Sequence, residues 1–124
     1  IKVLLVDSGY TFDKTDEFVN DISPGVNEVT NANGTGYERK TLSNKAQTLD
    51  GTNDRVYFDA DNPTYSAIDT NEDLAAAIVY KEVTDDTDSP VISHLDLADL
   101  STNGSDIELP VDGGGLFRVN NSLS

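Results

Sequence analysis

The chain has 124 residues and a net charge of −15, from 23 acidic and 8 basic residues. Its length fits one domain with a single hydrophobic core. Because cysteine is absent, a disulfide framework, a thiolate metal site and a cysteine nucleophile are excluded. The negative field repels phosphate backbones and anionic lipid, so we expect neither nucleic acid nor a membrane as partner.

The chain is expected to form one domain over residues 1–124, because neither a linker nor an internal repeat divides it. It contains no apolar run long enough to cross a bilayer. Its first residues, Ile1-Lys2-Val3, have the composition of the middle of a strand. We therefore expect an N-terminal segment to be missing in front of them.

The balance of side chains indicates short strands joined by polar turns. Asp and Asn occur 17 and 11 times, whereas Glu occurs 6 times. Asp and Asn favour turns because their short side chains bond nearby backbone groups, and few Glu residues leave little helix preference. The sequence therefore predicts an all-β fold, an antiparallel β-sandwich or jelly-roll-like domain, with one short helix.

The first expected elements are a strand and that helix. Residues 1–6 are apolar on both faces apart from Lys2, which predicts a central strand. Residues 15–22 predict the short helix, with Thr15 as its N-cap and Pro24-Gly25 as its end. Its acidic first turn and its apolar face are formed by Asp16, Glu17, Phe18, Val19 and Ile22.

Four further strands are expected. Residues 55–60, 106–111 and 116–120 alternate between apolar and polar side chains, as strands with one buried face do. Residues 74–83 are rich in alanine, which favours a helix, but Ile78-Val79-Tyr80 favours a strand. We expect this segment to be a long strand buried on both faces.

The histidine at position 94 raises the question of a catalytic triad, because Ser93 and Asp96 lie beside it. In a strand, Ser93 and His94 face opposite ways, and the chain has no Gly-x-Ser-x-Gly motif. We expect His94 to be a partly exposed strand residue. One histidine without cysteine also makes a zinc site a poor fit.

Carboxylates are the abundant reactive groups, and two clusters stand out. Asp59 lies near Asp61, and Asp85 and Asp86 lie near Asp88. Such loops can supply oxygen ligands to calcium, but neither cluster matches the calcium-loop pattern. A hydrolase using paired carboxylates is a further alternative, which alanine replacement at Asp59, Asp61, Asp85 and Asp86 would test.

The glycine run Gly113-Gly114-Gly115 follows an expected strand. Neither a helix pattern nor a Lys-Ser/Thr pair follows it, so it predicts a flexible turn and not a phosphate loop. We therefore expect no catalytic, cofactor-binding or metal-binding residue, no cofactor and no enzymatic activity.

Four segments in order along the chain resemble a family of small virion proteins of tailed bacteriophages. They are residues 1–15 (IKVLLVDSGYTFDKT), 34–42 (GTGYERKTL), 53–68 (NDRVYFDADNPTYSAI) and 76–97 (AAIVYKEVTDDTDSPVISHLDL). Members of the family usually have an N-terminal helix before the first strand. Where an Arg-Tyr pair often precedes their alanine-rich strand, this chain has Asp73-Leu74.

The resemblance implies a β-sandwich bound to the phage particle and made in the cytoplasm of the bacterial host. Within that setting we expect a head decoration, or cement, protein on the outer surface of the head, with the major capsid protein as its partner. A homotrimer is expected by analogy with decoration proteins on three-fold axes. The alternative is a tail- or fibre-associated adhesion module that binds host glycans.

Overall fold

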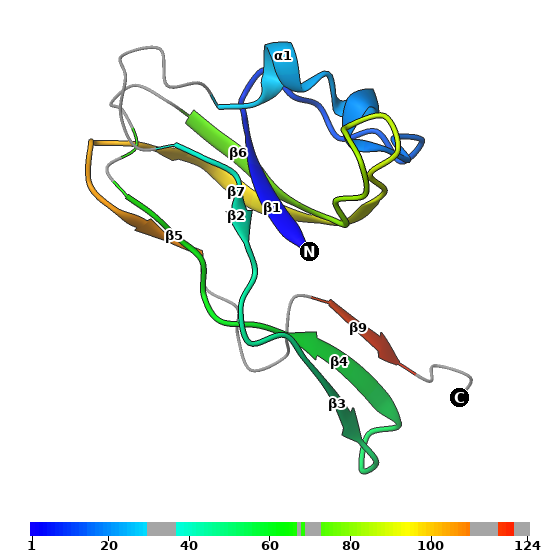
Figure 1. Ribbon diagram of the computed structural model, residues 1–124. Coiled ribbons are helices and arrows are strands. Elements are labelled where there is room, and N and C mark those ends of the chain that lie inside the picture. Colours follow the sequence, from blue (N-terminus) through cyan, green and yellow to red (C-terminus); the bar gives the residue numbers. More distant parts are fainter. Residues whose placement is uncertain (30–36, 67, 69–72, 110–116, 121–124) are drawn as a thin grey trace.

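The computed structural model describes residues 1–29, 37–66, 68, 73–109 and 117–120. It is mainly β with antiparallel sheets and little helix, which confirms the predicted class (Figure 1). The elements, in chain order, are β1 (Lys2–Asp7), the 3-10 helix η1 (Val19–Ile22), α1 (Pro24–Asn27), β2 (Lys40–Thr41), β3 (Ala46–Asp50), β4 (Arg55–Asp59), β5 (Thr64–Tyr65), β6 (Asp73–Tyr80), β7 (Val91–Ser101), β8 (Ile107–Glu108) and β9 (Phe117–Asn120).

A four-stranded antiparallel sheet forms the body of the molecule, in the order β2-β1-β6-β7. The expected strand at residues 1–6 is confirmed as β1, and it is central because β2 and β6 flank it. The expected strand at 74–83 is confirmed as β6, which ends at Tyr80. Branched and aromatic side chains after Ala77 outweigh the helix preference of alanine because both faces of β6 are buried.

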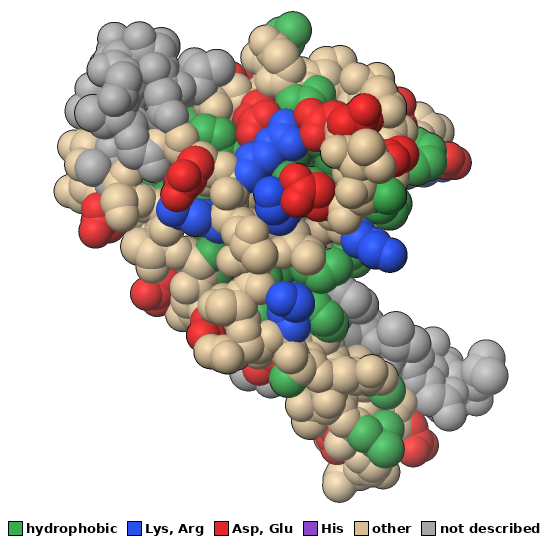
Figure 2. Space-filling view, viewed as in Figure 1, with side chains coloured by type: hydrophobic (Ala, Val, Ile, Leu, Met, Phe, Trp, Pro, Cys, Tyr) green, Lys and Arg blue, Asp and Glu red, His purple; other side chains and the backbone are tan. Residues whose placement is uncertain are grey.

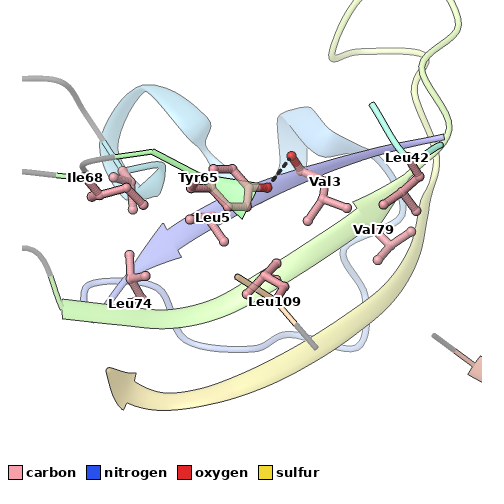
Figure 3. Packing of buried hydrophobic residues seen from close by; sticks show 10 residues of the cluster. Val3, Leu5, Leu42, Tyr65, Ile68, Leu74, Val79 and Leu109 are labelled. Atoms are coloured by element: carbon pink, nitrogen blue, oxygen red, sulfur yellow. Dashed lines mark hydrogen bonds between the residues drawn. The ribbon is translucent and has the colours of Figure 1, made fainter. Parts of the chain in front are cut away.

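The two central strands carry apolar side chains on both faces. Val3 and Leu5 of β1 join one buried cluster, and Leu4 and Val6 join the other, as the alternation of a strand requires. The first cluster is covered by the two-stranded β5–β8 sheet, from which Tyr65 donates a hydrogen bond of 3.1 Å to the carbonyl of Val3 (Figure 3). One face of the large sheet is therefore covered by a small second sheet.

The opposite face of the sheet is covered by the segment predicted to form a helix over 15–22. The short helix is confirmed at Val19–Ile22, and the prediction is wrong for residues 15–18. The helical turn begins after Phe18, and Thr15 donates to Asp13 and does not cap a helix. The Asp21 carboxylate accepts the backbone N–H groups at the turn's start, at 2.9 and 3.1 Å. Pro24-Gly25 opens α1 and does not end the helix, because proline fits a first helical turn.

The expected apolar face of that helix is partly confirmed. Val19 and Ile22 are buried in the second cluster, against Leu4, Val6 and Ile78 of the sheet. Burying a side chain of this kind contributes about 1.5–3 kcal/mol, so two of them hold the short turn without a longer helix. Among the described residues, no helix is long and apolar enough to cross a membrane.

Strands β3, β4 and β9 form a second antiparallel sheet, which projects away from the body (Figure 1). We call residues 45–61 and 117–120 the arm. The strands expected at 55–60 and 116–120 are confirmed as β4 and β9, whereas β3 was not expected. The strand expected at 106–111 is confirmed at β8, which ends at Glu108, and Leu109 is buried as its alternation requires. Residues 110 and 111 lie outside the described residues.

Candidate functional site

A cleft of about 470 Å³ opens on the body beside the start of β7. Its walls come from two parts of the chain, the loop at 12–16 and the first residues of β7. The residues that line it are Phe12, Asp13, Lys14, Asp16, Val91, Ile92, Ser93 and His94. It therefore combines an aromatic ring, aliphatic side chains and charges of both signs in one hollow.

The loop is held against β7 by backbone hydrogen bonds. The N–H of Val91 donates to the carbonyl of Glu17 at 2.9 Å, and the N–H of Val19 donates to the carbonyl of Ser89 at 3.0 Å. Asp13 folds the loop itself, because its carboxylate accepts both the N–H and the hydroxyl of Thr15, at 2.8 and 2.7 Å. The wall opposite β7 is thus a fixed turn.

Three rings stand together at the cleft. The centre of the Phe12 ring lies 4.9 Å from that of His94, and the Tyr10 ring lies 6.2 Å from His94. The Tyr10 hydroxyl donates to Asp16 at 3.0 Å. Partial burial, together with the hydrogen bond to Asp16 and the charge of Asp16, raises the pKa of Tyr10 to about 12, so this phenol keeps its proton to a higher pH than an ordinary tyrosine.

The geometry of the cleft suits a polar ligand with an apolar face. Phe12 is 59% exposed although its ring is held against His94, so one side of a large aromatic surface remains accessible. Ile92 is exposed beside it, and Lys14 adds a cation. A flat ring with hydroxyl groups at its rim could stack on Phe12 and bond to the polar residues.

The structure places Ser93, His94 and Asp96 on β7, as a strand reading requires. His94 pairs with Ile78 and is partly buried, which confirms the expected strand histidine. Ser93 pairs with Val79, so it alternates with His94 across the sheet. This alternation directs the hydroxyl and the imidazole to opposite faces and gives a triad no common site.

The Asp85–Asp88 loop uses its carboxylates to fold itself. Asp85 accepts the N–H and the hydroxyl of Thr87, at 2.8 and 2.6 Å. Asp88 accepts the N–H groups of Thr84 and Asp85, and these bonds lower the pKa of Asp88. Because the carboxylates of Asp85 and Asp88 bond to backbone and side-chain groups of their own turn, they stabilise the loop itself. In the described part of the chain, no three potential metal-ligating side chains come together.

The other candidates also have structural contacts or lie outside the described residues. The Asp59 carboxylate accepts the next backbone N–H, at 2.8 Å. Asp61 accepts from the side chains of Ser43 and Asn44 where the arm joins the body. In the described part of the chain, no hydrogen bond joins Asp59 or Asp61 to the 85–88 loop. Gly113, Gly114 and Gly115 lie outside the described residues.

A second polar group, which the sequence pattern does not single out, is centred on Arg39. We call it the Arg39 cluster, and it consists of Glu28, Tyr37, Arg39, Tyr80 and Asp86. Arg39 binds Glu28 through two nitrogens at 2.7 Å each, and binds Asp86 at 2.6 and 2.9 Å. Figure 2 shows basic side chains enclosed by acidic ones on this face of the body.

The cluster ties together three separated parts of the chain. The Tyr37 hydroxyl donates to Glu28 at 2.6 Å and accepts the N–H of Leu5 at 3.1 Å. Hydrogen bonds from Arg39 lower the pKa of Asp86, and burial raises that of Tyr37. Since Arg39 satisfies two carboxylates at once, it joins α1, the end of β6 and the 81–90 loop into one rigid unit.

Neither the cleft nor the Arg39 cluster has a strong sequence signal. Phe12 is an apolar residue in a polar loop, which is a weak indication of a binding role. Tyr37 and Arg39 are two positions apart, so in an extended segment they share one face. Their partners come from distant positions, and spacing alone does not reveal such pairs. Comparisons of the chain with protein-family models, with curated proteins and with solved structures give no match.

Proposed function

We propose that this chain is a structural protein of a tailed-bacteriophage virion, a head decoration protein that binds the lattice of the major capsid protein and has no enzymatic activity. The resemblance of four segments to that family supplies the setting. The structural observation that carries the proposal is the combination of a rigid body with a projecting three-stranded arm. Such a shape can touch more than one neighbour on a lattice.

Two physical properties support this role. The Arg39 cluster and the doubly covered sheet make the body stiff, and a stiff domain loses little entropy when it docks. The net charge of −15 keeps decorated particles apart and repels shed nucleic acid. On a symmetric shell, each weak contact is repeated and adds to the stability of the whole. A homotrimer on the outer surface of the head remains part of the proposal.

Binding to capsids tests the proposal directly. The chain is added to capsids assembled without it, and bound protein is measured after sedimentation. Saturable binding, together with a higher melting temperature of the capsids, is the expected result. Capsids that already carry the protein serve as the control and should take up none. Recovery of the chain with purified tails, and not with heads, would overturn the proposal.

The cleft favours a second candidate function, an adhesion module that binds glycans of the host surface. The specific observation is the exposed Phe12 ring, held beside His94 with Lys14 in the same cleft. Sugars present C–H groups on one face and hydroxyl groups at the edge, which matches an aromatic ring with polar neighbours. Because Asp85 and Asp88 are bonded within their own loop, such binding is expected not to need calcium.

A pair of matched variants tests the second candidate. Phe12→Ala should abolish binding to host cells, whereas Val26→Ala, which changes another exposed apolar residue far from the cleft, should leave it intact. Binding in the presence of a chelator should be unchanged. Loss of binding in both variants, or no cell binding by the unaltered chain, would remove this candidate.

A further inference from the structure

The arm has one face that is polar and fixed in shape. Asp50 accepts hydrogen bonds from the Arg55 guanidinium at 2.9 Å and from the Tyr57 hydroxyl at 3.0 Å. The guanidinium of Arg55 also lies 5.0 Å from the centre of the Tyr57 ring. These contacts join neighbouring strands on a single face, so the hairpin of β3 and β4 is a firm platform.

The opposite face of the hairpin is apolar and open. Leu49 pairs with Val56, and both alternate with the residues of the polar face. Leu49 is 75% exposed, whereas Phe58, nearer the body, packs against the main core. Figure 2 shows hydrophobic side chains towards the free end of the arm. Leu49 and Val56 lie opposite one another and form a continuous apolar surface on this face, as interaction surfaces do.

The outer edge of β3 lacks the features that normally protect a sheet edge. In the described part of the chain, β4 pairs with one side of β3 and no strand pairs with the other. The register with β4 is regular over all of Ala46–Asp50, the strand contains no proline, and its one charged residue, Asp50, is ion-paired with Arg55 within the hairpin. A regular edge without an unpaired charge readily accepts another strand.

Both edges of the large sheet differ from the outer edge of β3. β2 is two residues long and includes Lys40. The pairing of β7 with β6 is interrupted at two places, and β7 carries Asp96. Short length, charge and irregular pairing are the features by which proteins prevent pairing between edges. Of these three edges, β3 is the one suited to pairing with another strand.

Charge identifies the occupant of this edge. The arm holds three basic and four acidic residues and so has a net charge of −1, in a chain of −15. Almost all of the negative charge therefore lies outside the arm. Two copies of the chain repel one another through their bodies, and they can approach at low electrostatic cost through their arms. A second copy is thus the partner that this surface fits.

We infer that the arm is the self-association surface of this protein: the outer edge of β3 and the apolar face around Leu49 bind the arm of a second copy. The paired arms extend the β3–β4 sheet and cover Leu49, while the acidic bodies stay apart. This inference rests on the proposed function only for its setting, because the isolated chain can show the contact without a capsid.

The mass of the chain in solution tests the inference. Light scattering over a concentration series should give a multiple of the monomer mass, and Leu49→Lys should shift the chain to monomer. Val26→Lys is the matched control, because Val26 is 78% exposed on α1 in the body and should leave the mass unchanged. A monomer at every concentration, or an equal effect of both variants, would overturn the inference.

Cross-linking provides a second readout that does not depend on disrupting the contact. Because the chain has no cysteine, Leu49→Cys and Val26→Cys each introduce a single thiol. A short bismaleimide should join copies of Leu49→Cys efficiently and copies of Val26→Cys poorly. Equal cross-linking of the two variants would contradict an arm-to-arm contact, since both thiols are exposed and differ in position alone.

The capsid experiment separates this inference from the proposed function. A chain that binds capsids saturably but is monomeric, with no cross-linking of Leu49→Cys on the particle, retains the decoration role and refutes the arm contact. A chain that self-associates through the arm but does not bind capsids supports the arm contact and refutes the decoration role. The two failures therefore give different results.

Discussion

Arg39 and Asp86 form a two-point ion pair across 47 positions of sequence, with nitrogen–oxygen distances of 2.6 and 2.9 Å. The pair fixes the 81–90 loop over the end of β6, because the same guanidinium also binds Glu28 beside α1. The Arg39 side chain thus connects its own segment to α1 and to the 81–90 loop. Because Glu28 and Asp86 can be replaced one at a time, the contribution of each carboxylate to the free energy of unfolding can be measured.

Two identical substitutions should differ strongly in their effect on stability. Glu28→Gln should lower the free energy of unfolding by about 1–3 kcal/mol, since Glu28 is 14% exposed and accepts from both Arg39 and Tyr37. Glu38→Gln should cost less than about 0.5 kcal/mol, because Glu38 is 75% exposed and pairs with Lys40 at the surface. Urea unfolding followed by circular dichroism measures both. Equal losses would contradict a stabilising role of the Arg39 cluster.

The contribution of Asp86 to stability should depend on pH in one direction. Hydrogen bonds from Arg39 hold the pKa of Asp86 below its ordinary 3.8. A carboxyl with a lowered pKa stabilises the fold above its unfolded pKa and loses this contribution as pH falls through the folded pKa. The difference in unfolding free energy between the unaltered chain and Asp86→Asn should therefore be constant near neutrality and shrink below pH 3.8. A difference that grows on acidification would refute this assignment.

The Tyr10 hydroxyl should lose its proton at a higher pH than an ordinary tyrosine. Its pKa of about 12 means that the neutral phenol is favoured in the folded chain, so its contribution to stability is complete below pH 10.0 and is lost between pH 10.0 and about 12. Carbon NMR of labelled tyrosine measures the titration. Asp16→Asn should lower the pKa part of the way, because burial remains. No change in that variant would show that Asp16 has no influence on the phenol.

Core and surface valines provide a test of the packing. Val3→Ala should destabilise the chain by about 2 kcal/mol, because Val3 is buried in the first cluster of the sheet. Val26→Ala makes the same change on exposed α1 and should alter the unfolding free energy by less than about 0.5 kcal/mol. Both are measured by chemical unfolding. A large effect at Val26 would mean that α1 is packed against something in solution.

Periodicity predicts the central strands well because both of their faces are buried. β1 and β6 consist of apolar residues almost throughout, and such runs have few alternatives. The short helix was misplaced because the acidic residues at 16 and 17 imitate a first turn, while the actual turn is closed by Asp21 from within. The sequence of β3 alternates only weakly, and its side chains are mostly exposed. β3 is therefore a strand because it pairs with β4, and its own sequence pattern does not reveal it.

The candidate sites were harder to predict than the strands. The partners of Arg39 come from α1 and from the 81–90 loop, which meet because the sheet brings them together. The cleft likewise needs the 12–16 loop to lie beside β7, a contact made by backbone hydrogen bonds that every sequence can form. Carboxylate spacing drew attention to Asp85 and Asp88, whose bonds are local turn contacts.

The position of β1 has a consequence for how the chain acquires its structure. β1 is translated long before β6, yet Val3 pairs with Val79, and both faces of β1 are buried against later segments. In a nascent chain, the apolar and aggregation-prone segment of β1 is therefore exposed until residue 80 has left the ribosome. Folding dominated by such distant pairings is slow. We expect production in cells to be limited by aggregation during synthesis, and added chaperone to raise the yield.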